Sequence, residues 1–277
     1  MRVASWNILH GSPIPPVSPV THDITGIADV IAQSNIDVIG LQEIDDYQER
    51  SGEHSQISAI AAKLGTSHSA YARTVIGTPG FNWRKLRKDE AVINPSDTQA
   101  SYGIGLISKV PVLRWQTLTL GRSLVGLPLA VPGGKDGKSL RFLYVKDEPR
   151  LAMAAHLDNG YTVIVTHLSF VPFVNAWQLL RVKRWAKKIH GKDSQEKIII
   201  LGDLNLPFNL PIRPRFISQW ESLSSQKSYP SWKPAIQFDY ILRLKKGAKK
   251  EGAQKEVKVI SLPGSGYSDH LPVVIDL

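Results

Sequence analysis

The segment from Ile198 to Asn205 is the stretch of this sequence whose residue types and spacing are best suited to chemistry. Its apolar half predicts a buried strand that ends at Gly202, and Asp203 and Asn205 follow two residues apart. An extended backbone directs side chains at this spacing to the same side of the chain. The carboxylate and the carboxamide could then hold a metal-bound phosphate and a water together. Because Asp and Asn after a strand are more often turn formers, this interpretation needs partner residues elsewhere.

Carboxylate, carboxamide and imidazole side chains that could act with Asp203 and Asn205 also lie at the ends of other apolar segments. Each has a structural explanation by itself: Asn7 as a turn residue, Glu43 as a solvated acid at a helix start, and His167 as a hydrogen-bonded core histidine. What these residues share is a position where an apolar strand stops, the edge at which sandwich and α/β folds gather polar groups. The pattern therefore indicates one site built from distant segments: Asn7, Glu43, His167, Asp203, Asn205, Asp239, Asp269 and His270.

The elements that must position these residues are short. Apolar residues at helical spacing predict helices at 23–34, at 56–64 with Gly65 as a C-cap, and at 173–189. Strands are expected at 3–8, 37–42, 103–108, 151–157, 161–166, 197–202, 238–242, 257–262 and 273–277, with a hairpin turn at Asp158-Asn159-Gly160. Many short strands with few helices predict a two-sheet sandwich flanked by helices.

The composition limits the kind of protein and the kind of metal site. A length of 277 residues is compatible with one large domain or with two small ones. The absence of cysteine excludes disulfides, thiolate zinc sites and cysteine nucleophiles, so a metal would need oxygen or imidazole ligands. No apolar stretch approaches the ~20 residues of a membrane-spanning helix. No secretory signal precedes the first strand, and a cytoplasmic location is expected.

The chain is basic, with 34 Lys and Arg against 24 Asp and Glu and a net charge of +10. Such a balance suits a phosphate-rich polyanion or an anionic membrane surface. Two basic stretches, 77–97 and 244–258, are interpreted as loop excursions, and solvated surface explains both unless they flank the site. The first combines an indole with cations, which suits single-stranded nucleic acid or anionic lipid headgroups: Trp83, Arg84, Lys85, Arg87 and Lys88.

Seven motifs, in this order, resemble the motif series of the endonuclease/exonuclease/phosphatase superfamily. They are Ser5-Trp6-Asn7, Asp37-Val38-Ile39-Gly40-Leu41-Gln42-Glu43, Tyr102-Gly103-Ile104-Gly105-Leu106-Ile107-Ser108, Thr166-His167-Leu168, Gly202-Asp203-Leu204-Asn205, Phe238-Asp239-Tyr240-Ile241-Leu242 and Ser268-Asp269-His270-Leu271-Pro272-Val273. One such motif would be weak, but seven in order are specific, and they span nearly the whole chain. The resemblance implies a single domain over 1–277 with a four-layer α/β/β/α sandwich, in which two mostly antiparallel sheets pack face to face between helices.

The resemblance also implies a metal site. Glu43 matches the family's metal-ligand glutamate, and Asn7 matches the asparagine beside it. Asp269 would either support the metal through a water or hold its loop. The implied ion is Mg²⁺ or Mn²⁺, because both favour oxygen ligands and keep several waters.

Further roles follow from the same resemblance. Asp203 matches the residue that orients or deprotonates the attacking water, and Asn205 matches the one that hydrogen-bonds the phosphate. His270 and Asp239 match the family's His–Asp pair, and His167 matches the donor to the transition-state oxyanion. Whether Asp203 or His270 takes the proton stays open.

Tyr102 and Arg150 are weaker candidates for contact with the substrate. Tyr102 could reach the phosphate, but a tyrosine before a Gly-x-Gly strand is about as often a packing residue. Arg150 follows Pro149 at a strand start and could contact either phosphate or backbone.

These residues together predict a divalent-metal-dependent phosphoesterase. Abasic-site endonucleases carry a tyrosine where this chain has Thr166-His167-Leu168, which favours the histidine-containing branches, including non-specific nucleases, deadenylases and sphingomyelinases. The basic surplus favours nucleic acid, so a nuclease or nucleotide phosphodiesterase is the leading expectation. The alternatives are a sphingomyelinase-like lipid phosphodiesterase, a phosphatase of small molecules or inositol phosphates, and a non-catalytic binding module of the same fold. The last would predict a missing ligand residue, and none is missing.

Overall fold

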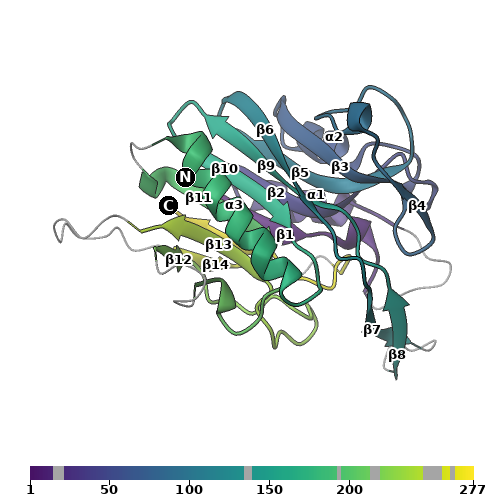
Figure 1. Ribbon diagram of the computed structural model, residues 1–277. Coiled ribbons are helices and arrows are strands. Elements are labelled where there is room, and N and C mark those ends of the chain that lie inside the picture. The colour runs from purple at the N-terminus through teal and green to yellow at the C-terminus, as the bar shows by residue number, and fades with distance from the viewer. Residues whose placement is uncertain (15–21, 134–138, 192–194, 213–218, 246–257, 263–265) are drawn as a thin grey trace.

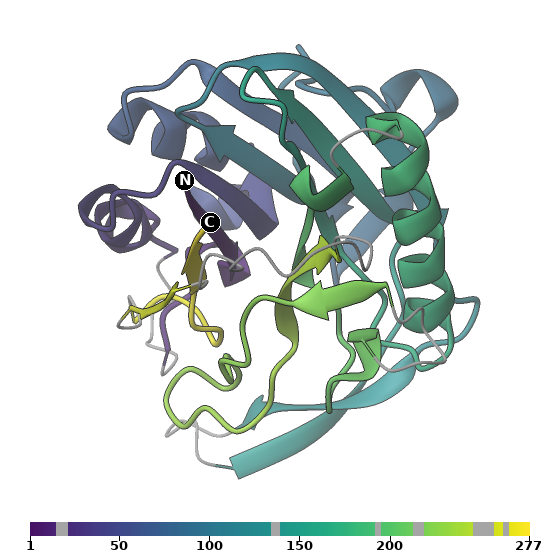
Figure 2. The same cartoon turned by 90° about the vertical axis from the view of Figure 1, so that its left-hand side faces the viewer.

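The computed structural model describes residues 1–14, 22–133, 139–191, 195–212, 219–245, 258–262 and 266–277. Two large sheets lie face to face, with helices on the outer surface of each (Figures 1 and 2). The seven-stranded sheet has the order β14 (Lys258–Ser261), β15 (Val273–Asp276), β1 (Arg2–Asn7), β2 (Val38–Asp46), β5 (Ser101–Ser108), β3 (His68–Thr78) and β4 (Asn82–Lys85).

The second sheet has six strands. Their order is β12 (Trp220–Ser222), β13 (Asp239–Leu244), β11 (Ile198–Asp203), β10 (Thr162–His167), β9 (Arg150–Leu157) and β6 (Val112–Gly121). A separate hairpin of β7 (Leu127–Gly133) and β8 (Ser139–Val145) projects from the body of the molecule (Figure 1). The expected turn at 158–160 joins β9 to β10.

Most strand pairs are antiparallel, and each large sheet contains one parallel pair. These pairs are β1 with β2 and β10 with β11. A helix connects each pair, α1 (Thr25–Gln33) in the first and α3 (Val174–His190) in the second. Since parallel strands end at the same edge of a sheet, both units deliver their last residues to one side.

Three apolar layers hold the fold together. The central layer joins the two sheets, with Val38 on one side and Leu201 on the other. A Cβ atom added at Gly40 would lie 2.1 Å from Cδ1 of Leu201, so only glycine permits this approach of the sheets. The outer layers join the seven-stranded sheet to α1 and α2 (Gln56–Lys63) and the six-stranded sheet to α3 (Figure 2). The expected four-layer sandwich is confirmed.

The prediction of an irregular loop over 77–97 was wrong in its first part. β3 extends to Thr78, and residues 82–85 form β4, which pairs with β3 in an antiparallel hairpin. A short 3₁₀ helix follows at Lys88–Glu90. Polar residues on an edge strand give no apolar run, and β4 was missed for lack of that signal. The sequence interpretation also missed β3, β6, β7, β8 and β12. The other predicted loop, 244–258, lies mostly outside the described residues.

The described part of the chain was also searched for membrane spans. None of its helices combines the length and the apolar character needed to cross a bilayer.

Candidate functional site

The polar residues predicted from the sequence converge at one edge of the sandwich. His167 ends β10, Asp203 ends β11 and Asp239 begins β13, and the strand registers place His167 beside Asp203 and Asp203 beside Asp239. β10 and β11 are parallel, while β13 runs antiparallel to β11, so two strand ends and one strand start lie in a row. The sheet pairing itself therefore assembles three of the candidate residues.

Gly202 makes the close packing at this row feasible. Its φ is +145°, and a Cβ atom there would lie 1.8 Å from the carbonyl oxygen of Thr166. Only glycine tolerates both the dihedral and the contact. The Gly202-Asp203 step thus lets the end of β11 lie directly against β10 with Asp203 at the site.

A β-bulge in β2 directs Glu43 to the same edge. The register of β2 against β5 shifts between Gln42 and Ile44, and Glu43 between them has φ of +58°. Asn7 Nδ2 donates to Glu43 Oε1 at 2.9 Å and to Asp203 Oδ2 at 3.2 Å, while Asn7 Oδ1 accepts the Leu9 N–H at 3.1 Å. Asn7 therefore ties a carboxylate of one sheet to a carboxylate of the other.

Hydrogen bonds from the side chains of Trp6 and Ser268 hold the first and last motifs together. The Trp6 indole N–H donates to the His270 carbonyl at 2.9 Å, and the Ser268 hydroxyl donates to the Asn7 carbonyl at 2.7 Å. Ser268 Oγ also accepts the backbone N–H of His270 at 3.0 Å. Segments more than 260 positions apart are thereby fixed relative to each other.

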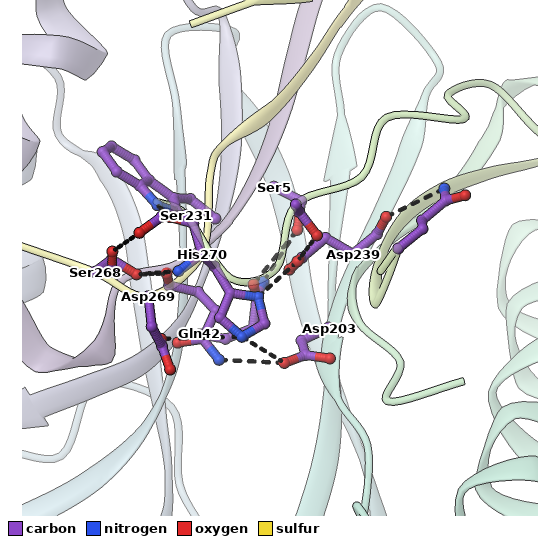
Figure 3. A network of polar contacts seen from close by, with 12 residues as sticks. Ser5, Gln42, Asp203, Ser231, Asp239, Ser268, Asp269 and His270 are labelled. Atoms are coloured by element: carbon purple, nitrogen blue, oxygen red, sulfur yellow. Dashed lines mark hydrogen bonds and ion pairs between the residues drawn. The ribbon is translucent and has the colours of Figure 1, made fainter. Parts of the chain in front are cut away.

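His270 forms a buried pair with Asp239. Its Nδ1 lies 2.7 Å from Asp239 Oδ2, which also accepts the hydroxyl of Ser228, and its Nε2 lies 3.8 Å from Asp203 Oδ2 (Figure 3). Burial lowers the pKa of His270, but the charge and hydrogen bond of Asp239 outweigh it, so the pKa is raised well above the ordinary value. The protonated imidazolium is the favoured state.

The pKa values of Asp203 and His167 are both shifted toward the uncharged form of the side chain. Burial and the neighbouring charge of Asp239 raise the pKa of Asp203 to about 6, although the Asn205 N–H donates to Oδ1 at 3.0 Å. Burial, with a smaller contribution from Arg150, holds the pKa of His167 well below its ordinary value. His167 is therefore neutral, and its Nε2 lies 3.6 Å from Asp203 Oδ2.

The start of α3 holds Asn205 in place. The Asn175 side chain, in the first turn of α3, donates to the Asn205 carbonyl at 2.9 Å. Asn205 has φ of +49° and donates its own Nδ2 to the Leu168 carbonyl at 3.0 Å, with His167 Nε2 at 3.4 Å. The carboxamide of Asn205 thus lies beside the imidazole of His167.

These groups face a cleft of about 1060 Å³, at the upper end of the volumes of ligand pockets. Asn7 and Asp239 lie behind its wall, fully buried. The predicted residues that line the cleft are Glu43, Tyr102, Arg150, His167, Asp203, Asn205, Asp269 and His270. The structure therefore brings all ten predicted site residues to one place.

Tyr102 and Arg150 form one wall of the cleft. Burial and the charge of Glu43 raise the pKa of Tyr102 well above its ordinary range, so the phenol stays protonated. Arg150 is 4% exposed, and its guanidinium lies 3.8 Å from Asp147. A cation held in this way can face an anionic ligand without moving.

The sequence interpretation missed three residues that also line the cleft: Arg50, Glu148 and Tyr229. Arg50 is fixed by two 2.7 Å hydrogen bonds to Asp45, and nothing in the sequence pattern indicated it. Glu148 is buried, and its pKa is raised by that burial. Its position directly before Pro149 and Arg150 was the available signal.

Two groups of side chains have donors suited to a metal ion. Ligand atoms of Asp203, Asp239 and His270 lie within 4.8 Å of one another, but His270 Nδ1 is occupied by the hydrogen bond that it donates to Asp239. The second group is Glu43 and Asp269. Burial and the charge of Asp269 raise the pKa of Glu43 to about 7, and Asp269 Oδ1 is buried with no hydrogen-bond partner in the described parts of the chain. Two crowded carboxylates with an unsatisfied oxygen fit an oxygen-ligated divalent cation.

The model of the Endonuclease/Exonuclease/phosphatase family matches residues 4–270. The chain belongs to this family. Its members are hydrolases that act on phosphate esters, and the match includes all ten predicted site residues, from Asn7 to His270. The expected superfamily is thereby confirmed, and no curated protein matches the chain.

Solved structures share the fold at low sequence identity. An endonuclease/exonuclease/phosphatase from Beutenbergia cavernae is 21% identical, with a TM-score of 0.58 over 99% of this chain and 70% of that chain. The mannosyl-6-phosphatase Bt3783 from Bacteroides thetaiotaomicron is 11% identical, with a TM-score of 0.55 over 100% and 98%. TDP2 from Caenorhabditis elegans is 15% identical, with a TM-score of 0.54 over 99% and 73%. These neighbours have different names and activities, so the likeness concerns the fold alone.

Proposed function

We propose that this protein is a divalent-metal-dependent phosphodiesterase that acts on nucleic acid or nucleotides. The observation that carries the proposal is the row of His167, Asp203 and Asp239 on adjacent strands, with His270 paired to Asp239 above the same cleft. The net charge of +10 supports a polyanionic substrate, as does the fixed cation of Arg150 in the cleft wall.

The protonation states support a division of the acid and base roles. With its raised pKa, His270 is a proton donor and a poor base, whereas Asp203, with a pKa of about 6, can orient and deprotonate a water near neutral pH. In the tautomer with its hydrogen on Nε2, neutral His167 donates a hydrogen bond to a phosphate oxygen, and the Asn205 carboxamide donates the Nδ2 hydrogen that the Leu168 carbonyl does not accept. Of the two alternatives left open by the sequence, these pKa directions support Asp203 as the base.

Glu43 and Asp269 would hold the metal, and Asn7 positions Glu43 through its 2.9 Å hydrogen bond. When bound, Mg²⁺ or Mn²⁺ supplies Lewis-acid polarisation of the phosphoryl oxygen and neutralises developing charge. Arg150 adds a fixed positive charge in the wall of the same cleft.

The test is hydrolysis of bis-p-nitrophenyl phosphate with Mg²⁺ or Mn²⁺, compared with the same assay in EDTA. We expect Asp203→Ala and His270→Ala each to lower kcat by about 10²- to 10⁴-fold, because each removes a proton-transfer group. His54→Ala is the matched control, since His54 is exposed and does not line the cleft. Circular dichroism checks folding. Full activity in either cleft variant would overturn the assigned roles, and inactivity of the unaltered protein on every phosphate ester would favour a binding module.

A second candidate function is a lipid phosphodiesterase. Two phenylalanines at the cleft are largely exposed, Phe173 at 87% and Phe208 at 74%, which suits a substrate with an apolar part. A panel of an oligonucleotide, phospholipid vesicles and a sugar phosphate, assayed at matched ionic strength, separates the candidates. Preference for the vesicles or for the phosphomonoester would contradict the nucleic-acid assignment.

A further inference from the structure

A second cavity lies beside the catalytic cleft, at the open edge between the two sheets. Its volume is about 580 Å³, and its walls come from β3, the segment after β4, β6 and the start of β9. Arg150 lines both this cavity and the catalytic cleft. A long substrate bound at the row of His167, Asp203 and Asp239 can therefore extend past Arg150 into the second cavity.

The charged residues that line this cavity all have one sign. Among the described residues, six cationic side chains line it and no carboxylate does: Arg73, Lys85, Arg87, Lys88, Arg122 and Arg150. Arg73 and Arg87 have ion-pair partners in Asp97 and Glu90. Lys85 and Lys88 are exposed, and neither has a partner among the residues that the structure describes. The cavity is therefore net positive.

Two of its arginines present buried donors without an acceptor. Nε of Arg122 and Nε of Arg150 are buried and have no hydrogen-bond partner in the described ranges. The Arg122 guanidinium is otherwise fixed, with Nη1 donating to the Asp147 carbonyl at 3.2 Å and the Trp83 ring 5.8 Å away. A buried donor without a partner destabilises the empty cavity, and the oxygens of a bound anion would satisfy it.

The remaining walls are apolar or carry hydroxyl groups. Leu86, Val92, Leu124 and Leu151 supply apolar surface, and three threonines supply hydroxyl groups. The volume exceeds what a bare phosphate needs and falls within the ~300–1,000 Å³ of ligand pockets. A phosphate that carries a sugar and a base matches both the cationic and the apolar lining.

We propose that this cavity is a binding subsite for a neighbouring nucleotide of a single-stranded polynucleotide, whose phosphate meets Arg122, Lys85 and Lys88 while the scissile phosphate occupies the catalytic cleft. The proposal rests on the proposed function, because it names the substrate of the same site. It also assigns a role to the basic segment 85–88. The sequence alone did not indicate whether this segment lies near the site.

The first test measures binding without turnover. Anisotropy of a labelled single-stranded oligonucleotide in EDTA is compared for the unaltered protein, Lys85→Ala/Lys88→Ala and Lys109→Ala/Lys188→Ala. Both variants lower the net charge of +10 by two, but Lys109 and Lys188 line neither cavity. We expect the Kd of the first variant to rise about 10-fold and its log–log salt slope to fall by about 0.7 for each phosphate that is no longer neutralised. Equal Kd values for the two variants would overturn the subsite.

The second test separates this subsite from the proposed function and from a lipid site. Lys85→Ala/Lys88→Ala should lower the ratio of kcat/KM on the oligonucleotide to kcat/KM on bis-p-nitrophenyl phosphate. If the unaltered protein hydrolyses neither substrate but the variant still binds the oligonucleotide more weakly, the proposed function fails and the subsite stands. If instead the variant binds phosphatidylcholine–phosphatidylserine vesicles more weakly and the oligonucleotide as before, the cavity recognises a lipid headgroup and the polynucleotide assignment fails.

Discussion

Two neighbouring carboxylates at the site have different surroundings, and this difference sets their chemistry. Asp239 accepts hydrogen bonds from His270 and from the Ser228 hydroxyl. Asp203 is its register partner on β11 and accepts weaker donors, the Asn7 carboxamide and the Asn205 N–H. Burial and the adjacent charge of Asp239 raise the pKa of Asp203 to about 6, because two neighbouring carboxylates disfavour a second negative charge.

The role of Asp239 can be tested without changing its shape. Asp239→Asn removes the charge that keeps His270 protonated, and we expect kcat to fall by about 10²- to 10⁴-fold, with KM much less affected. The loss should be smallest at low pH, where the imidazole is protonated without help. Steady-state kinetics across the pH range checks this, with the melting temperature as the folding control. A pH-independent loss would contradict positioning and charge stabilisation by Asp239.

A buried lysine outside the site makes a prediction about stability. Lys183 in α3 is 0% exposed, and burial lowers its pKa from 10.5 to about 7. Between these values the unfolded chain binds the extra proton, so the free energy of unfolding rises with pH, by at most about 1.4 kcal/mol per pH unit. Lys183→Met should remove this rise.

Urea unfolding of the unaltered protein and of Lys183→Met, at several pH values within that window, measures the difference. Lys187→Met, in the last turn of the same helix, is the control and should retain the pH dependence. Parallel stability curves for the unaltered protein and Lys183→Met would show that Lys183 is charged in the folded state.

At the scale of elements, the site depends on local departures from regular geometry. The bulge at Glu43 interrupts the alternation of side chains between the two faces of β2. Asn205, with a positive φ, turns the chain directly after β11. The β3–β4 hairpin leads the basic segment 85–88 to the edge of β6, beside Arg150. Bulges and left-handed residues of this kind are found where side chains must be re-aimed at functional sites.

Gly202 offers the sharpest test at this scale. In Gly202→Ala the new methyl group would overlap the Thr166 carbonyl, so β10 and β11 would have to separate at the site. We expect a loss of about 2–4 kcal/mol in the free energy of unfolding and a larger relative loss of activity. Gly65→Ala is the control, because Gly65 has φ of +66° with no atom within 4 Å, and its positive φ should cost about 1–2 kcal/mol without loss of activity.

At the scale of the whole molecule, the site lies across the interface between the sheets. Asn7, Glu43 and Tyr102 come from the seven-stranded sheet, whereas His167 and Asp203 come from the other. The apolar layer between the sheets includes residues of both, and Trp6 and Trp220 are fully buried in the two outer layers. Neither sheet alone can bury its inner face or complete the site, which supports a single folding unit.

A single unit should unfold in one step despite its size. We expect far-ultraviolet circular dichroism and tryptophan fluorescence to give coincident denaturation curves, because probes in both outer layers depend on the shared central layer. Loss of activity should follow the same curve. Two separated transitions would indicate that the two sheets form domains of their own.

The sequence by itself determined the family, the fold class and the residue types that meet at the candidate site. Motifs with fixed internal spacing carry the residue types of the site, and apolar runs such as 198–202 or 161–166 predict buried central strands, because such strands are covered on both faces. All ten predicted residues therefore lie at one site. Edge strands such as β4 and β6 carry exposed polar residues and lack this signal.

Only the tertiary structure decided how the residues act on one another. No sequence pattern indicates the ion pair of Arg50 with Asp45 or the second cavity beside Arg150. The proposed division of roles between Asp203 and His270 likewise rests on which side chain Asp239 contacts. Protonation and charge depend on distance and on exclusion of water, and both are set when segments remote in the chain pack together.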